Sequence, residues 1–232
     1  MLFTKSISRP LVSEIYDFLF NVKKLEKCEK LEIILHSGGG DIDAAYHLGK
    51  MLRSFASKQF NVIVPRFAKS AGTLLACAGD VIVMERPSEL GSLEPLIEMS
   101  TGEEFSPLSI DELIEFLDNI EKRLGGSSRI LEIIANRLPI MQIGDCLKSI
   151  KYAEPLLREL LMNGMFKNDT FKEKKVDRIC RRLIYEYPLK GHGYVIDMYE
   201  AKKIGLKIEN PPRDQWEIIW RIFRIFEKEF LL

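Results

Sequence analysis

Short apolar runs alternate with amphipathic stretches in the N-terminal part of the chain. Runs rich in branched apolar residues cover 31–36, 61–67 and 80–85, which is typical of buried strands. Between them, residues 41–55 repeat Ala and Leu at helical spacing, and residues 70–79 are small and apolar throughout. This strand–helix–strand–helix–strand order predicts right-handed crossovers and a largely parallel sheet covered on both faces.

Helical patterns precede and follow this region. Residues 9–22 predict a helix with Leu11, Ile15, Phe18 and Leu19 on one buried face. After Pro107 the pattern becomes mainly helical, and strand-forming residues return near 193–196. We therefore predict three parts, an α/β core (1–106), a helical insertion (107–190) and a return to the core with a C-terminal helix (191–232).

The C-terminal helix is expected to be strongly amphipathic. Large apolar side chains from Trp216 to Phe226 fall near one stripe, which predicts packing against the core or another subunit. Arg221, Arg224 and Lys228 line the other side, so attachment to a membrane surface is the alternative.

Composition narrows the classes of partner. Lys+Arg and Asp+Glu both number 34, so the formal net charge is zero and nothing favours nucleic acid. The four cysteines are scattered without a CxxC pair and the three histidines are dispersed, so we expect no metal site and reduced thiols. Without an apolar run of membrane-spanning length, we predict a cytoplasmic protein with no stable membrane insertion.

Three glycines follow the first of these strands, in the turn Ser37–Gly40. Glycine permits positive φ and close approach of a ligand, and a helix start offers unpaired amides. The pattern is not GxGxxG, and Asp41 and Asp43 would repel a phosphate. The turn therefore favours an oxyanion hole for a neutral carbonyl over a phosphate site.

Ser70 lies between a strand and a helix, followed by Ala71 and Gly72. Small neighbours leave its hydroxyl accessible, although a helix N-cap is the common role of such a serine. Both turns are expected at the carboxyl ends of adjacent strands, where open α/β sheets bind ligands. We therefore favour Ser70 as a nucleophile, with oxyanion donors from Gly39 or Gly40 and from Ala71.

These segments resemble a known family. HSGGGDIDAA, VPRFAKSAGTLLACAGDVIVM, SELGSLEP and YVIDMYEAKKIGL occur in the order seen in the Clp peptidase/crotonase superfamily, most closely in the serine dehydrogenase proteinases. The resemblance implies an α/β Clp peptidase/crotonase-like (ββα) spiral core with a helical insertion. It also implies Ser70 as nucleophile, Gly39, Gly40 and Ala71 as the oxyanion hole, a homo-oligomer, and no metal or nucleotide cofactor.

The general base departs from the Clp peptidase pattern. Where those enzymes carry a histidine after the serine, this sequence has Leu93, Glu94 and Pro95. Lys122 is a candidate if burial lowers its pKa, His192 needs little adjustment of its pKa, and Glu94 is a third option.

The two cations near the serine are interpreted differently from these candidate bases. Lys69 and Arg66 are expected to be substrate-side or surface charges, because adjacent residues of such a turn point apart.

The sequence thus predicts a serine peptidase-like hydrolase acting on peptides or proteins. Two alternatives stay open, a non-catalytic oligomeric binding or scaffold protein, and a crotonase-type acyl-thioester enzyme. The substrate, the size of the oligomer and the role of the 107–190 helices stay open as well.

Overall fold

The computed structural model describes residues 2–3, 6–93, 97–98, 104–105, 115, 118–119, 122, 140–191 and 193–230. Most of the first part of the predicted helical insertion, residues 107–139, falls outside these residues, so the outcome of that prediction is open there.

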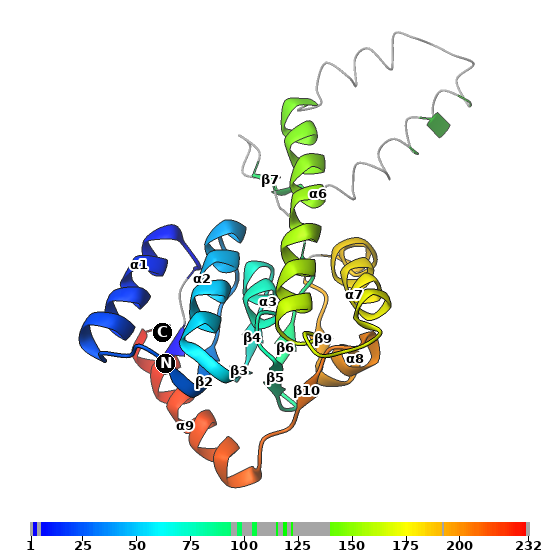
Figure 1. Cartoon of the computed structure of the whole chain (residues 1–232). Coiled ribbons are helices and arrows are strands. Elements are labelled where there is room, and N and C mark those ends of the chain that lie inside the picture. Colours follow the sequence, from blue (N-terminus) through cyan, green and yellow to red (C-terminus); the bar gives the residue numbers. More distant parts are fainter. Residues whose placement is uncertain are drawn as a thin grey trace.

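A parallel five-stranded sheet forms the centre of the fold (Figure 1). Its order is β1 (Leu2–Phe3), β2 (Cys28–Leu35), β3 (Ala56–Val64), β5 (Val81–Met84) and β10 (Ile208–Glu209), and every neighbouring pair is parallel. The predicted parallel α/β core is therefore confirmed. Strand β3 begins directly after a helix, five residues earlier than expected, because its polar first half pairs with the start of β2.

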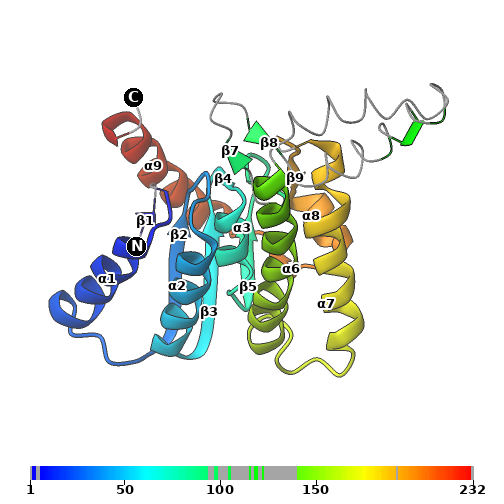
Figure 2. The same cartoon turned by 90° about the horizontal axis from the view of Figure 1, so that it is seen from above.

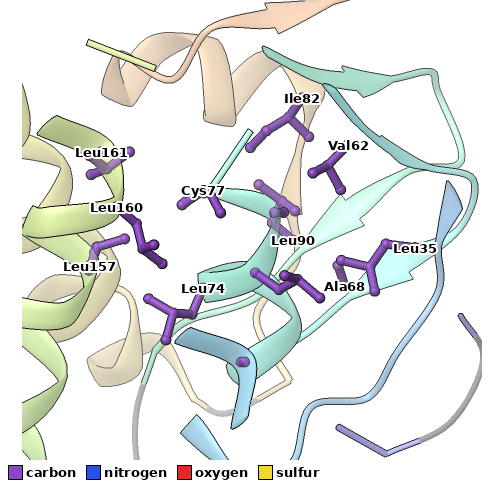
Figure 3. Packing of buried hydrophobic residues seen from close by; sticks show 14 of the residues in the cluster. Leu35, Val62, Ala68, Leu74, Cys77, Ile82, Leu90, Leu157, Leu160 and Leu161 are labelled. Carbon is purple, nitrogen blue, oxygen red and sulfur yellow. The ribbon is translucent and has the colours of Figure 1, made fainter. Parts of the chain in front are cut away.

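Helices cover both faces of this sheet. Helices α2 (Ile42–Phe55), α3 (Ala71–Ala76) and α6 (Ile140–Asn163) lie on one face, and α9 (Arg213–Phe230) crosses the other (Figure 1). The close view shows Leu74 of α3 and Cys77, which follows α3, between Val62 of the sheet and Leu160 of α6 (Figure 3). These side chains are almost fully buried, as expected for a parallel sheet covered on both sides.

A small second sheet continues the chain beyond the carboxyl ends of β3 and β5. Strand β4 (Phe67–Ala68) pairs in parallel with β6 (Glu89–Leu90), which pairs antiparallel with β9 (Ile196–Asp197). A separate hairpin joins β7 (Ile97–Glu98) to β8 (Glu104–Phe105). The three-stranded sheet matters for function because β4 leads directly to Ser70.

The remaining elements lie around this framework. They are α1 (Arg9–Asp17), the π-helical turn η1 (Phe18–Val22), α7 (Lys172–Cys180), η2 (Arg181–Glu186), η3 (Pro188–Lys190) and α8 (Met198–Ile204). Helices α6 and α7 bury side chains such as Leu157 and Ile179 in the same apolar cluster as the sheet. Among the described residues, no helix has the length and apolar character needed to cross a membrane.

Two amphipathic patterns had different outcomes. Ile15 and Leu19 are buried as predicted, but Phe18 is 39% exposed because a π-helical turn replaces the regular α-helix from that residue. In α9, Phe223 is fully buried, which confirms packing of the predicted stripe against the core. A second row of α9, Ile218, Ile222 and Ile225, is exposed.

Candidate active site

The glycine turn and the serine turn lie side by side. The Ser37 amide donates to the Phe67 carbonyl at 3.0 Å, and the Lys69 amide donates to the Ser37 carbonyl at 2.9 Å. These bonds extend the pairing between the end of β2 and β4. An ideal Cβ on Gly39 would lie 3.0 Å from Ser70 Cβ. Only glycine fits this contact, so the two turns meet at one place.

Ser70 holds a strained backbone conformation. Its φ is 48° and its ψ is −120°, and only Lys24 shares positive φ among the described non-glycine residues. The hydroxyl of Ser70 makes no capping hydrogen bond to α3, so the N-cap interpretation is not supported. Strained turns of this kind, between a strand and a helix, are typical of nucleophilic serines.

The backbone amides of the two turns differ in their hydrogen bonds. The Gly39 amide donates to Ser37 Oγ at 3.1 Å. The amides of Gly40 and Ala71, by contrast, have no hydrogen-bond acceptor within the part of the chain that the structure describes. An oxyanion hole requires amides without an internal acceptor.

The N-terminal segment fixes the conformation of the glycine turn. The Ile7 amide donates to the Gly39 carbonyl, and the Asp41 amide donates to the Ile7 carbonyl, both at 2.8 Å. Gly40 has a φ of 136°, and a Cβ there would lie 2.2 Å from the Ile7 carbonyl oxygen. Any larger residue at position 40 must therefore displace this segment.

Asp41 occupies the N-terminus of α2. Its carboxylate accepts the amides of Asp43 and Ala44 at 2.8 and 3.0 Å, and the hydrogen bond from Ala44 is the main cause of its lowered pKa. A negative side chain in this position disfavours phosphate at the same helix end. The oxyanion interpretation of the turn is consistent with this arrangement.

Lys69, expected to be a substrate-side or surface charge, is not at the open surface. Its side chain is only 19% exposed, and its Nζ lies 2.9 Å from Glu89 Oε2 and 3.1 Å from the Leu90 carbonyl. Arg66 also pairs with Glu89, whose side chain is 11% exposed. This cluster connects the turn before Ser70 to β6. Sequence reasoning missed Glu89 because a glutamate in a turn-rich passage gives no signal of burial.

Thr73 makes a second polar connection to the same strand. Its hydroxyl lies 2.7 Å from the Ala68 carbonyl and 3.0 Å from the Gly91 carbonyl, and it accepts the Gly91 amide at 3.0 Å. Buried hydrogen bonds of this kind fix the backbone on both sides of Ser70.

The candidate bases are placed unequally. His192 and Glu94 fall outside the described residues, whereas Lys122 is described and exposed. The Tyr194 amide donates to the Gly191 carbonyl at 2.9 Å. The Tyr194 carbonyl lies 3.5 Å from Lys69 Nζ, so Tyr194 approaches the residue next to Ser70.

Potential metal ligands and thiols lie apart from the site. The described residues contain no group of three or more His, Cys, Asp or Glu side chains that could hold a metal ion. Cys180 is buried, and burial raises the pKa of its thiol to about 12, which makes it a poor nucleophile.

Comparison with solved structures supports the fold. A mutant of the 1510-N membrane-bound stomatin-specific protease aligns with a TM-score of 0.55 and 14% identity, covering 94% of this chain and 81% of that chain. ClpP1 from Listeria monocytogenes aligns with a TM-score of 0.50 and 13% identity, covering 93% of both chains. At these identities the likeness concerns the fold.

Sequence comparison gives the family. Two uncharacterized proteins of Methanocaldococcus jannaschii are 26% and 25% identical over 88% and 82% of this chain. The matches span 62% and 56% of those relatives, so the chain corresponds to little more than half of their length. The pattern of the ClpP-like SDH-type serine proteinases matches residues 13–225. The chain therefore belongs to the ClpP-like SDH-type serine proteinase family.

Proposed function

We propose that the protein is a serine peptidase in which Ser70 is the nucleophile. Family and fold support a protease-type function. The observation that carries the assignment to Ser70 is its strained φ of 48° at the contact with Gly39, with a hydroxyl that caps no helix. In this proposal the strain holds the hydroxyl toward the amides of Gly40 and Ala71.

The proposed reaction follows the acyl-enzyme route. Ser70 Oγ bonds to the carbonyl carbon of a peptide while its proton passes to the general base. The resulting oxyanion accepts the amides of Gly40 and Ala71. The C–N bond then breaks, and the leaving amine takes the proton from the base. Water next attacks the acyl-enzyme while the base takes its proton, and the acyl group leaves as Ser70 recovers a proton from the base.

We favour His192 as the base over Lys122 and Glu94. In support, the carbonyl of Tyr194, two residues further along the chain, lies 3.5 Å from Lys69 Nζ. A histidine also titrates near neutral pH without special burial. Lys122 is exposed, so it lacks the burial that a lysine needs to act as a base.

The substrate class follows from the family, whose members are described as serine proteinases. We accordingly propose a peptide or protein substrate, and a homo-oligomer as the working form. Both proposals concern the segment that matches the relatives, which extend further.

Labelling with a fluorophosphonate probe tests the assignment. We expect the wild-type protein to be labelled and Ser70→Ala to lose the label completely, because the probe reacts only with an activated serine. Ser13→Ala, at an exposed position of α1, is the matched control and should label normally. Circular dichroism should confirm that both variants are folded.

Failure of labelling would favour one of the other functions. A folded wild-type protein that resists the probe contradicts the hydrolase and supports a non-catalytic binding role. Binding of an acyl-CoA with the same affinity by wild type and Ser70→Ala would instead indicate the crotonase-type alternative, which uses oxyanion amides without a nucleophilic serine.

A further inference from the structure

A hollow of about 420 Å³ lies between α7, α8 and the connection from α6 to α7. Its lining residues are Phe166, Phe171, Lys174, Lys175, Arg178, Ile204, Gly205 and Lys207. Figure 2 places α7 at the edge of the molecule away from α1 and α9. The adjoining Gly164 contacts Ala78, beyond the C-terminal end of α3, whereas Ser70 precedes the N-terminal end of that helix. The hollow is therefore separate from the candidate active site.

Every titratable residue that lines this hollow is a cation. Lys175 pairs with Asp169, which lies outside the lining. Lys174, Arg178 and Lys207 have no carboxylate partner among the residues that the structure describes. In a chain with no net charge, such a local excess of unpaired cations attracts an anionic partner.

Two of these cations are held in place without being neutralised. The Arg178 guanidinium donates to the Lys203 carbonyl, and Lys207 Nζ donates to the Met165 carbonyl. Lys207 Nζ also lies 5.2 Å from the centre of the Phe166 ring. Backbone carbonyls orient the side chains without neutralising them, although Lys207 also interacts electrostatically with Asp169. This orientation reduces the ordering cost of binding an anion.

The walls of the hollow are apolar. Phe166 and Ile204 are buried, whereas Phe171 is 71% exposed at the start of α7. A pocket of this size with apolar walls and a few polar groups is typical of ligand sites. It suits a carboxylate carried next to an apolar side chain better than a bare ion.

A second hollow of about 480 Å³ shares Lys174 and Arg178 with the first. Arg181 and Arg182 line it together with two acids, Asp177 and Glu186. A uniform polyanion, such as nucleic acid or an anionic bilayer, would meet these carboxylates. An extended peptide can instead place acidic residues in the first hollow and other residues in the second, since its side chains alternate along the chain.

We propose that the two hollows beside α7 form a docking site for an acidic peptide segment with apolar residues between its carboxylates. Its carboxylates pair with Lys174, Arg178 and Lys207, and an apolar side chain packs against the exposed Phe171. This site is independent of hydrolysis at Ser70, so it would exist in a catalytic or a non-catalytic protein.

Fluorescence anisotropy with a labelled peptide of alternating Glu and Leu residues tests the proposal. We expect saturable binding that weakens with salt, and a loss of about tenfold in Lys174→Glu, because a repulsive charge replaces an attractive one. Lys174 is exposed and makes no described ion pair, so its replacement should not disturb folding. Lys27→Glu, the same change of charge at an exposed position outside both hollows, should bind as wild type does.

Several results would overturn the docking site. They are no binding of the acidic peptide to the folded wild type, equal weakening in Lys174→Glu and Lys27→Glu, or equally tight binding of a matched Lys–Leu peptide. Phosphatidylserine vesicles serve as a further arm. Vesicle binding that Lys174→Glu abolishes, without binding of the peptide, would identify the partner as a lipid surface and refute the peptide.

Discussion

Two adjacent residues at the end of β2, His36 and Ser37, face regions held together in different ways. Ser37 faces the glycine turn, where backbone amides and hydroxyls form hydrogen bonds at defined distances. His36 faces α9, and the centre of its ring lies 4.8 Å from the centre of the Phe223 ring in that helix. The centre of the Phe67 ring, in β4, lies 3.9 Å away.

The two regions differ in how directional their stabilising contacts are. Around Ser37 and Ser70, hydrogen bonds and a buried ion pair fix the backbone, including one strained residue. Around His36, α9 is held by apolar packing. Ile219 of this helix packs against a small separate cluster formed by Ile63, Val81 and Val83 of the sheet. Directional contacts preserve a geometry that chemistry needs, whereas apolar contacts preserve burial with less control of position.

Replacing Gly40 should disturb the hydrogen-bonded region around Ser37 and Ser70 more than the other substitutions do. In Gly40→Ala the new Cβ would lie 2.2 Å from the Ile7 carbonyl oxygen at a φ of 136°, so the turn must move. We expect fluorophosphonate labelling to slow by about 10²–10³, the usual effect of losing an oxyanion donor. Gly38→Ala is the control, because a Cβ at position 38 meets nothing within 4 Å. Equal rates in the two variants would contradict the role of Gly40.

Removing the cation beside Ser70 should have an intermediate effect. Lys69→Met leaves Glu89 with Arg66 alone and removes one of the links between β6 and the serine turn. We expect a loss of about 1–3 kcal/mol in the free energy of unfolding and about tenfold slower labelling, since small displacements of a nucleophile are costly.

The control for this variant is an exposed ion pair. Lys58 and Glu29 are 68% and 75% exposed, so Lys58→Met should change stability by less than about 1 kcal/mol and leave labelling unchanged. Lys69→Arg, which retains the charge, should recover part of the labelling rate. If Lys69→Met labels as fast as wild type, the ion pair does not position Ser70.

The smallest effect is expected at His36, as a dependence of stability on pH. Burial is the main cause of the lowered pKa of His36, while Glu227 opposes this shift and Arg66 reinforces it. The unfolded chain therefore binds a proton more readily, and stability should fall as the pH drops below the ordinary value of 6.5. Urea unfolding of wild type and His36→Phe between about pH 5 and 7 measures this contribution. Identical slopes would show that the titration of His36 does not contribute.

The sequence by itself determined the parallel α/β order and the family. Apolar runs at Leu31–Leu35 and Val81–Val83 indicated buried strands, since their short length and branched side chains suit a covered sheet. The small residues of the glycine turn and of the serine turn also indicated that other groups approach the backbone closely at these two places. These signals are local, because residue type and spacing carry them, and they do not depend on which other segments pack nearby.

Only the tertiary structure decided which of these features meet and in what environment. Contact of Gly39 with Ser70 depends on the pairing of β2 with β3 and on the bridge to β4, which join residues distant in sequence. Burial of Lys69 depends likewise on Glu89, twenty residues further along the chain. A pattern read along one segment contains no information on such partners, because burial and strain arise from the segments that pack against it.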